Sequence, residues 1–174
     1  MSFFKNLFKK KEEPQAVPKE AVKKALKEVA AVMNGDVKPI TESPDPVFAQ
    51  KMMGDGYVII PSDGKVIAPF DGKVATAFPT KHAVGLVSND GVELLIHIGL
   101  DTVSLNGEGF KIFVKADDTV KKGDTLLQVD LDFIKSKGLQ TATPVVVTNL
   151  SDDQTMELKK TGNVTAGETV LVIK

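Results

Sequence analysis

The chain contains only two histidines, His82 and His97, and their side chains are its strongest candidates for chemistry near neutral pH. A neutral imidazole offers a nitrogen lone pair that can accept a transferred group. Cysteine is absent, which excludes a thiol nucleophile, disulfide bonds and thiolate metal sites. The two imidazoles are therefore the first candidates for a covalent or acid–base role.

His97 interrupts an apolar run, GVELLIHIGLDTV over residues 91–103, that is typical of a buried strand. Burying a polar ring without a partner costs about 1–3 kcal/mol, so His97 is either a hydrogen-bonded core residue or a functional one. Gly99 permits close backbone approach, and its carbonyl can accept from Nδ1, which would leave the Nε2 lone pair outward. For His82, the alternative to a functional role is a solvated loop histidine.

Several common functional classes are disfavoured. No G-x-S-x-G motif is present, and no phosphate-binding loop of the form G-x-x-x-x-G-K-[ST]. All 22 basic residues are lysines, there is no tryptophan, and Tyr57 is the single tyrosine. The absence of arginine side chains and the scarcity of aromatic stacking surfaces disfavour sequence-specific binding of nucleic acid. No stretch of about 18 apolar residues occurs, so no membrane-spanning helix is expected.

The elements that must position the histidines are predicted to be short strands. Valine, threonine and isoleucine are frequent from residue 29 onward, and Asp-Gly pairs mark tight turns at 55–56, 63–64, 71–72 and 90–91. This pattern predicts an all-β fold, an antiparallel β-sandwich or flattened barrel, with short helical turns only. The clearest helical segment in this region is LDFIKSK over residues 131–137.

Two internal echoes indicate a duplicated hairpin motif. AVMNGDV at 31–37 resembles APFDGKV at 68–74, and VKKGDTLLQV at 120–129 resembles VTAGETVLVI at 164–173. A single hairpin cannot bury its apolar face alone, whereas two units that face each other can. The alternative is that short hairpins converge on such patterns by chance.

Residues 1–28 are predicted to form a lysine-rich amphipathic N-terminal tail and linker, and residues 29–174 the folded domain. Phenylalanine and leucine recur at helical spacing in the first eleven residues beside a run of lysines. Such a segment can lie on an anionic bilayer, with each lysine contributing about 1 kcal/mol; the alternative is a solvated tail. A helix is also predicted over residues 20–29, where apolar residues share one face.

Several motifs together resemble the enzyme IIA components, glucose class, of the bacterial phosphoenolpyruvate:sugar phosphotransferase system (PTS). The run 91–103 matches the family's active-site signature at every position, and the Thr-x-His motif is present at 80–82. Further matches are DPVFA at 45–49, GEGF at 107–110, the V-x-x-G-D-T turn at 120–125, and TPVV at 143–146. The resemblance covers about residues 29–174 and implies a PTS EIIA type-1 domain with a duplicated antiparallel β-sandwich.

The resemblance implies a phosphohistidine relay with these roles. His97 would accept the phosphoryl group on Nε2, and His82 would hydrogen-bond the phosphoryl oxygens. Thr80 would hold His82 through its hydroxyl group. No cofactor is required, although some members of the family bind Zn²⁺, which here would lie between His82 and His97 and take a partner's glutamate.

The resemblance also implies the partners and the surface they meet. The donor would be the phosphocarrier protein HPr, and the acceptor a cysteine on a sugar-specific enzyme IIB or IICB permease, with other enzymes or permeases as regulated targets. Asp45 and Asp101 would flank the site and meet cationic residues of HPr. Val47, Phe48 and Phe78 would line an apolar docking depression. The expected location is the cytoplasm, with peripheral membrane contact through residues 1–11.

Two other functional classes stay open on sequence alone. One is a regulatory binding module that phosphorylation switches, without a role in sugar transport. The other is a prosthetic-group carrier, because VKKGDTLL at 120–127 is similar to the hairpins of lipoyl and biotinyl domains. The lysine context expected of such a carrier is absent, since Lys51 precedes Met52 and Met53 instead of lying between two methionines. The resemblance implies glucose as the sugar served, with sucrose, a β-glucoside and N-acetylglucosamine as the alternatives.

Overall fold

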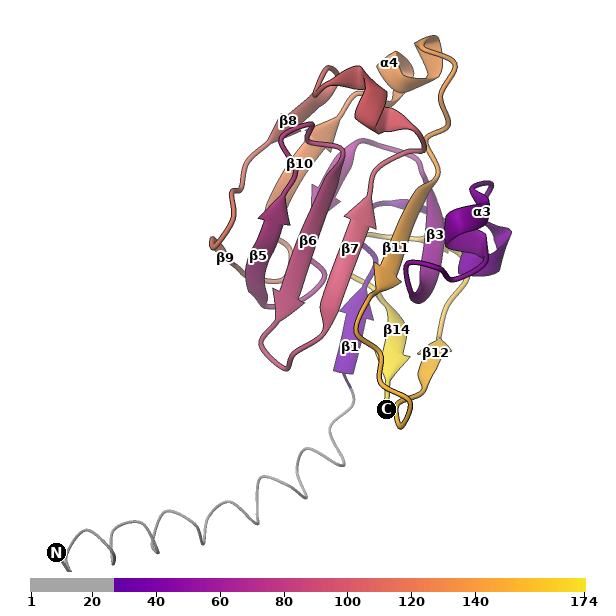
Figure 1. The fold of residues 1–174 in the computed structure, drawn as a ribbon, viewed down its shortest axis with the longest axis vertical. Coiled ribbons are helices and arrows are strands. Elements are labelled where there is room, and N and C mark those ends of the chain that lie inside the picture. The colour runs from indigo at the N-terminus through magenta and orange to yellow at the C-terminus, as the bar shows by residue number, and fades with distance from the viewer. Residues whose placement is uncertain (1–26) are drawn as a thin grey trace, which may run out of the picture.

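A computed structural model describes residues 27–174 (Figure 1). The elements in this part of the chain are mostly short strands: β1 (Lys27–Ala30), β2 (Gly35–Pro39), β3 (Asp55–Pro61), β4 (Lys65–Ile67), β5 (Gly72–Ala77), β6 (Ala83–Ser88), β7 (Glu93–His97), β8 (Phe110–Ile112), β9 (Thr119–Val120), β10 (Thr125–Val129), β11 (Thr143–Val147), β12 (Met156–Leu158), β13 (Gly162–Val164) and β14 (Thr169–Ile173). The helical elements are the α-helices α3 (Pro46–Ala49) and α4 (Leu131–Ser136) and the 3₁₀ turns η2 (Ile40–Glu42) and η3 (Thr102–Leu105).

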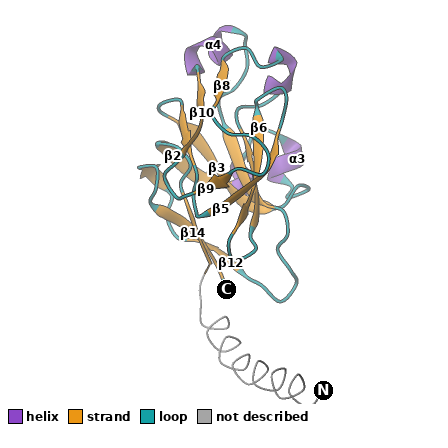
Figure 2. Ribbon diagram, turned by 90° about the vertical axis from the view of Figure 1, so that its left-hand side faces the viewer, coloured by secondary structure: helices purple, strands orange, loops and turns teal. Residues whose placement is uncertain are grey.

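The strands form one large sheet and two small ones, and every pairing is antiparallel. The large sheet has the order β13-β2-β3-β11-β7-β6-β5-β9, and the small sheets are β1-β14-β12 and β4-β10-β8. Figure 2 shows the strands as layers, with α4 at one end and the C-terminus toward the other. The predicted antiparallel all-β fold with short helical turns is confirmed.

The main core lies on one face of the large sheet, because its strands alternate inward and outward residues. In β7, Leu94 and Ile96 are buried in this core, whereas Leu95 and His97 point to the opposite face and are half-buried. A second, smaller apolar cluster covers that opposite face beside α3 and η2 and includes Ile40 and Phe48. His97 therefore lies where the outer face of the sheet meets this small cluster.

The duplicated hairpin motif is visible in matched backbone hydrogen bonds. Ala31 exchanges two bonds with the turn at Gly167–Glu168 (2.8 and 2.9 Å), and Ala68 exchanges the same two with the turn at Gly123–Asp124 (2.8 and 2.9 Å). The pairing of Gly35 with Val164 is repeated by that of Gly72 with Val120. Chance convergence of sequence would not place both copies in the same register.

The duplication also explains the order of the large sheet. The sheet divides into two halves of four strands, which from each edge to the centre are β13-β2-β3-β11 and β9-β5-β6-β7. The halves meet where β11 pairs with β7. The two histidines belong to the second half, on β7 and just before β6. The relationship between the halves brings the ends of β6 and β7 to the centre of the sheet, where the site is built.

Two sequence predictions about helices have different outcomes. The helix predicted at 131–137 is confirmed as α4, which begins where the Asp130 carboxylate accepts from Phe133 N (3.0 Å). The helix predicted over residues 20–29 is wrong for residues 27–29, which belong to β1 and pair with β14, and residues 20–26 lie outside the described part. Val29 is fully buried between the sheets, so tertiary pairing overrides the weak helical periodicity there.

The predicted membrane contact through residues 1–11 lies outside the described residues and stays a prediction. Within residues 27–174, no helix has the length and apolar character needed to cross a bilayer. The proposed division at residue 28 also stays a prediction, although β1 already begins at Lys27.

Candidate functional site

Strands β6 and β7 bring the two histidines together. Ala83, the first residue of β6, pairs with His97, the last residue of β7. The ladder continues one step further, because Ile98 N donates to the carbonyl oxygen of His82 at 2.7 Å. The imidazole rings consequently lie with their centroids 5.0 Å apart and their planes at 81°. Two side chains that are fifteen positions apart in the sequence therefore contact edge to face.

The His97 ring is oriented by its own backbone. Its Nδ1 lies 2.8 Å from the carbonyl oxygen of Gly99. A carbonyl can only accept, so Nδ1 carries the proton and the neutral ring has its lone pair on Nε2. Phe48 packs against the ring with centroids 5.2 Å apart. The half-buried ring is thus fixed in position and in tautomer.

The His82 ring is held by a side chain instead. Thr80 Oγ1 lies 2.6 Å from His82 Nδ1, and Phe78 contacts the ring edge-on with centroids 5.5 Å apart. The residue is only 6 % exposed, so it is not the solvated loop histidine that the sequence left open. Because both Nδ1 atoms are engaged, the chemistry of the pair is left to the two Nε2 atoms.

Burial keeps both imidazoles neutral near pH 7. Burial, and to a lesser extent the neighbouring His97, lowers the pKa of His82 to about 4. Burial also lowers the pKa of His97, although the Gly99 carbonyl and then the carboxylates of Asp45 and Asp101 oppose that shift. At neutral pH the His97 Nε2 lone pair therefore carries no proton, and the His82 ring is neutral.

Gly99 is fixed in a left-handed conformation by the segment around it. Its φ is +72°, and a Cβ placed there would lie 2.6 Å from Thr102 Cγ2 and 2.9 Å from the Gln140 carbonyl oxygen. Thr102 Oγ1 donates to the Ile98 carbonyl (2.6 Å), and Leu100 N donates to the Gln140 carbonyl (3.0 Å). These contacts aim the Gly99 carbonyl at His97.

Gln140 contributes to the site and was not singled out from the sequence. It acts through its backbone carbonyl and comes from a segment some forty residues away from His97. No spacing or composition signal marks a backbone acceptor, so only the folded structure identifies it.

The predicted acidic pair lies close to the His97 ring. The Asp45 carboxylate caps α3 by accepting from Val47 N (2.9 Å), and Asp101 directly precedes η3 with a φ of +59°. Both line one hollow of about 350 Å³ together with Leu100 and Gln140. Their charges are close enough to influence the pKa of His97.

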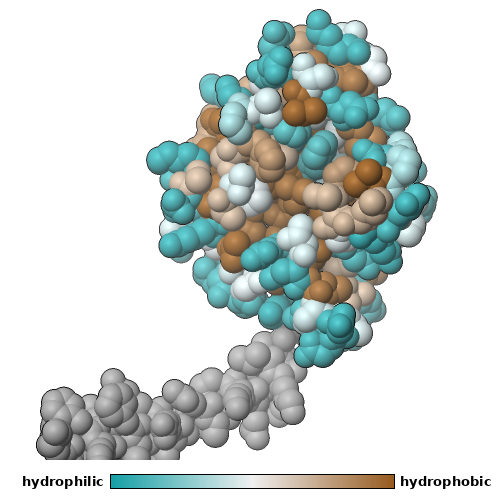
Figure 3. All heavy atoms as spheres, in the orientation of Figure 1, coloured by the Kyte–Doolittle hydropathy of each residue, from teal (hydrophilic) through white to brown (hydrophobic). Residues whose placement is uncertain are grey.

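The predicted apolar residues have unequal exposure. Val47 is 41 % exposed and Phe78 is partly exposed, whereas Phe48 is buried against His97 and serves as a wall of the site. Val103, which follows Asp101 along the chain, is 51 % exposed and adds to the apolar surface. Figure 3 shows apolar side chains gathered in the middle of this face and hydrophilic side chains around them.

Residues 27–174 do not gather three metal-ligating side chains of the kind a complete metal site needs. The two Nε2 atoms could supply two of the four ligands of a tetrahedral zinc site, so the others would have to come from outside this part of the chain. The zinc prediction at His82 and His97 remains a prediction.

Comparison with known proteins decides the family. Residues 27–153 match the family model described as phosphoenolpyruvate-dependent sugar phosphotransferase system, EIIA 1. The chain belongs to this family. It is 48 % identical over 172 residues to the "PTS system glucose-specific EIIA component" of Halalkalibacterium halodurans, covering 97 % of this chain and 96 % of that protein.

A second relative places the same unit in a longer protein. The "PTS system glucose-specific EIICBA component" of Staphylococcus saprophyticus is 56 % identical over 140 residues, which are 80 % of this chain and 20 % of that protein. The chain thus spans about a fifth of the length of this EIICBA relative.

A solved structure agrees in fold. The glucose permease IIA from Mycoplasma capricolum superposes with a TM-score of 0.80 at 42 % identity, covering 85 % of this chain and 96 % of that one. The EIIA chain described here is therefore a phosphotransferase-system component with the antiparallel β-sandwich of its family.

Proposed function

We propose that this EIIA chain is a phosphoryl carrier in which His97 Nε2 accepts the phosphoryl group of phospho-HPr and passes it to the cysteine of a sugar-specific enzyme IIB. The observation that supports this most directly is the bond between His97 Nδ1 and the Gly99 carbonyl (2.8 Å). It leaves the Nε2 lone pair available on a neutral, half-buried ring.

His82 is proposed to stabilise the transferred group. If the Thr80 hydroxyl donates to His82 Nδ1, the neutral ring carries its proton on Nε2 and can donate it to a phosphoryl oxygen. The 5.0 Å between ring centroids leaves the two Nε2 atoms close enough to act on one group. Transfer from the phosphohistidine of the donor to His97 then needs positioning and charge stabilisation rather than an activated nucleotide.

The surface around the two imidazole rings combines negative charge with apolar area, and this combination suits docking of both the donor HPr and the acceptor enzyme IIB. Asp45 and Asp101 provide negative charge toward a cationic donor, and the exposed Val47 and Val103 provide apolar area. An apolar wall such as Phe48 excludes water and so slows loss of the phosphoryl group by hydrolysis.

The transport role is favoured over a purely regulatory module. The Staphylococcus saprophyticus relative is named as an EIICBA component, in which the EIIA unit is joined to the units it would serve. Glucose is the sugar that the relatives' names suggest, and it is proposed for this chain on that basis. Family membership also supports action in the cytoplasm, where HPr and enzyme IIB would meet this surface.

The proposal is tested by incubating the protein with phosphoenolpyruvate, enzyme I and HPr and mapping the phosphorylated residue. We expect an acid-labile, base-stable phosphate at position 97 and none in His97→Ala. His82→Gln should still be labelled but should transfer the group poorly to enzyme IIB. Labelling of another residue, or equal onward transfer by His82→Gln and the unaltered protein, contradicts the relay. A mass addition on a lysine would indicate the prosthetic-group carrier.

Zinc binding is proposed only in the company of a partner, with His82 and His97 providing two ligands. Titration with Zn²⁺ alone should then show weak binding, because a two-imidazole site is incomplete. Tight binding to the isolated protein, unchanged in a His82→Gln, His97→Gln double variant, contradicts a shared site at these rings.

A further inference from the structure

Two Asn-Gly pairs occur in the chain, Asn34–Gly35 and Asn106–Gly107. They differ in how tightly hydrogen bonds and packing restrain them. In such a pair the following backbone nitrogen can attack the asparagine side chain, because glycine has no Cβ to obstruct the approach. The attack needs a free side-chain amide and a peptide unit able to turn. The two pairs therefore form an internal comparison within one molecule.

Asn34–Gly35 is locked. The Asn34 side chain donates from Nδ2 to Asp63 Oδ2 (2.7 Å) and accepts at Oδ1 from Ala166 N (2.7 Å). The Asn34 carbonyl accepts from Ser62 N (2.8 Å). Gly35 is buried between β13 and β3, and a Cβ there would lie 2.2 Å from the Ile60 carbonyl oxygen. The Asn34–Gly35 peptide cannot turn without opening the sheet.

Asn106–Gly107 is open. Asn106 follows η3, is exposed, and has a φ of +53°. Within residues 27–174, its side chain has no hydrogen-bond partner and Gly107 N donates to no backbone carbonyl. Gly107 has a φ of +91°, and a Cβ there would meet only the Lys81 side chain, at 3.6 Å or more. Asn106 N donates to the Val103 carbonyl (3.3 Å), and the Gly107 carbonyl accepts from Phe110 N (3.2 Å). Both bonds are local to the turn, so opening it separates no pair of strands.

We propose that Asn106 is a site of spontaneous deamidation in the folded protein, whereas Asn34 is protected. Gly107 N attacks Asn106 Cγ and forms an N–Cγ bond that closes a five-membered imide. The Cγ–Nδ2 bond breaks, and the side-chain nitrogen leaves as ammonia with the proton that Gly107 N gives up. Water then adds to one of the two imide carbonyls and opens the ring. The product is aspartate or isoaspartate at position 106, with one additional negative charge.

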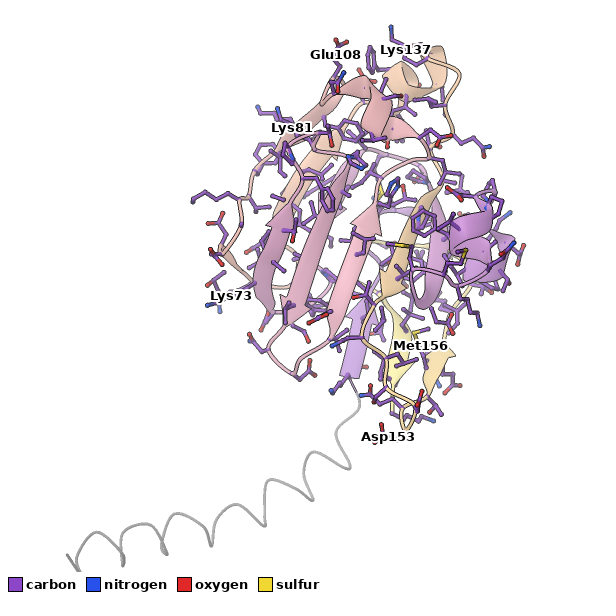
Figure 4. The ribbon with its side chains drawn as sticks, viewed as in Figure 1. Lys73, Lys81, Glu108, Lys137, Asp153 and Met156 are labelled. Atoms are coloured by element: carbon purple, nitrogen blue, oxygen red, sulfur yellow. The ribbon has the colours of Figure 1, made fainter. Side chains whose placement is uncertain are left out.

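The new charge lies on the face that carries the histidines. The Lys81 side chain lies over Gly107, and Lys81 directly precedes His82 in the chain. Figure 4 shows Lys81 and Glu108 at the same end of the molecule. A carboxylate at position 106 would offset the positive charge of Lys81 and extend the acidic rim formed by Asp101. If the proposed function is correct, both effects favour docking of a cationic donor.

The chemical step is tested by ageing the folded full chain at mildly alkaline pH and mapping deamidation by peptide mass spectrometry, with an isoaspartate-specific methyltransferase as a second readout. We expect conversion at position 106 at least about tenfold faster than at position 34. In urea, where the sheet no longer protects Asn34, the two rates should become similar. Equal rates in the folded protein, faster loss of Asn34, or a stable Asn106 overturns the proposal. Asn106→Gln is the control, because its longer side chain cannot close a five-membered ring.

The consequence for docking has a separate test. Asn106→Asp should lower the KM for phospho-HPr roughly two- to fivefold relative to Asn106→Gln, with kcat unchanged. An unchanged or raised KM contradicts the docking consequence while leaving the deamidation chemistry intact. Failure of both variants to accept phosphate at all would instead count against the proposed function.

Discussion

His97 Nδ1 and the Gly99 carbonyl oxygen lie 2.8 Å apart, so the residue that orients the candidate phosphoryl acceptor is two positions further along the same chain segment. This relationship couples the chemistry to one backbone conformation, the left-handed φ of +72° at Gly99. A change that moves this carbonyl would alter both the tautomer and the orientation of the His97 ring.

Gly99→Ala should therefore reduce stability and phosphoryl acceptance together. The added Cβ would lie 2.6 Å from Thr102 Cγ2 and 2.9 Å from the Gln140 carbonyl, so the loop must shift. We expect a loss of about 1–3 kcal/mol in the free energy of unfolding, measured with urea. The matched control is Gly123→Ala, which has a φ of +95° but open space around a Cβ.

The control separates backbone strain from displacement of the carbonyl. Gly123→Ala should lose stability through its positive φ yet accept phosphate from phospho-HPr at the normal rate. Equal acceptance by Gly99→Ala and Gly123→Ala would show that the Gly99 carbonyl does not control the His97 ring.

Thr80→Val should impair onward transfer more than acceptance. It removes the hydroxyl that lies 2.6 Å from His82 Nδ1, so the ring loses its fixed tautomer while His97 keeps its own. Loss of one such hydrogen bond, about 1–1.5 kcal/mol, corresponds to roughly a tenfold slower transfer to enzyme IIB. Stopped-flow transfer to enzyme IIB measures this rate.

Thr80→Ser and Thr119→Val serve as the comparisons. Serine retains the hydroxyl and should recover most of the rate, and Thr119 is an exposed residue of the edge strand β9. A Thr80→Ser protein as slow as Thr80→Val would indicate that the threonine methyl group, not the hydroxyl, matters.

The sequence predicted the side chains of the candidate site better than the helix and the backbone carbonyl that hold them in place. His82, His97 and Thr80 are marked by residue type and motif spacing, and the repeated Ala–Gly patterns at 31–37 and 68–74 predicted the duplication that the hydrogen bonds confirm. Helix α3 was not anticipated, although an N-cap aspartate followed by proline at Asp45–Pro46 is a known start signal. The Gln140 carbonyl could not be anticipated, because a backbone acceptor has no sequence signature.

The free energy of unfolding should decrease as the pH is lowered from 6.5 to about 4, because of His82. Its pKa is lowered from 6.5 to about 4 in the folded state, so below pH 6.5 the unfolded chain binds a proton that the folded one does not. The folded protein should lose on the order of 1–3 kcal/mol between pH 6.5 and pH 4 from this group. Urea unfolding at several pH values measures the loss.

His82→Gln isolates that contribution, because glutamine does not titrate in this range. The difference in stability between the variant and the unaltered protein should change between pH 7 and pH 4.5, with the variant relatively more stable at low pH. Parallel pH profiles for the two proteins would show that burial does not depress the pKa of His82.

Val47→Asp should weaken productive docking without harming the chemistry of the histidines. Val47 is 41 % exposed on α3 and its side chain does not support the core, so the fold should tolerate the change. A carboxylate there replaces apolar contact area, and desolvating it in an interface is unfavourable. We expect a KM for phospho-HPr several-fold higher with little change in kcat. This pattern arises when a variant weakens the bound complex and the transition state equally.

Phe113→Asp, at a similarly exposed residue after β8, is the comparison and should leave both constants unchanged. Equal effects of the two variants would mean that net charge, rather than contact at α3, governs the encounter.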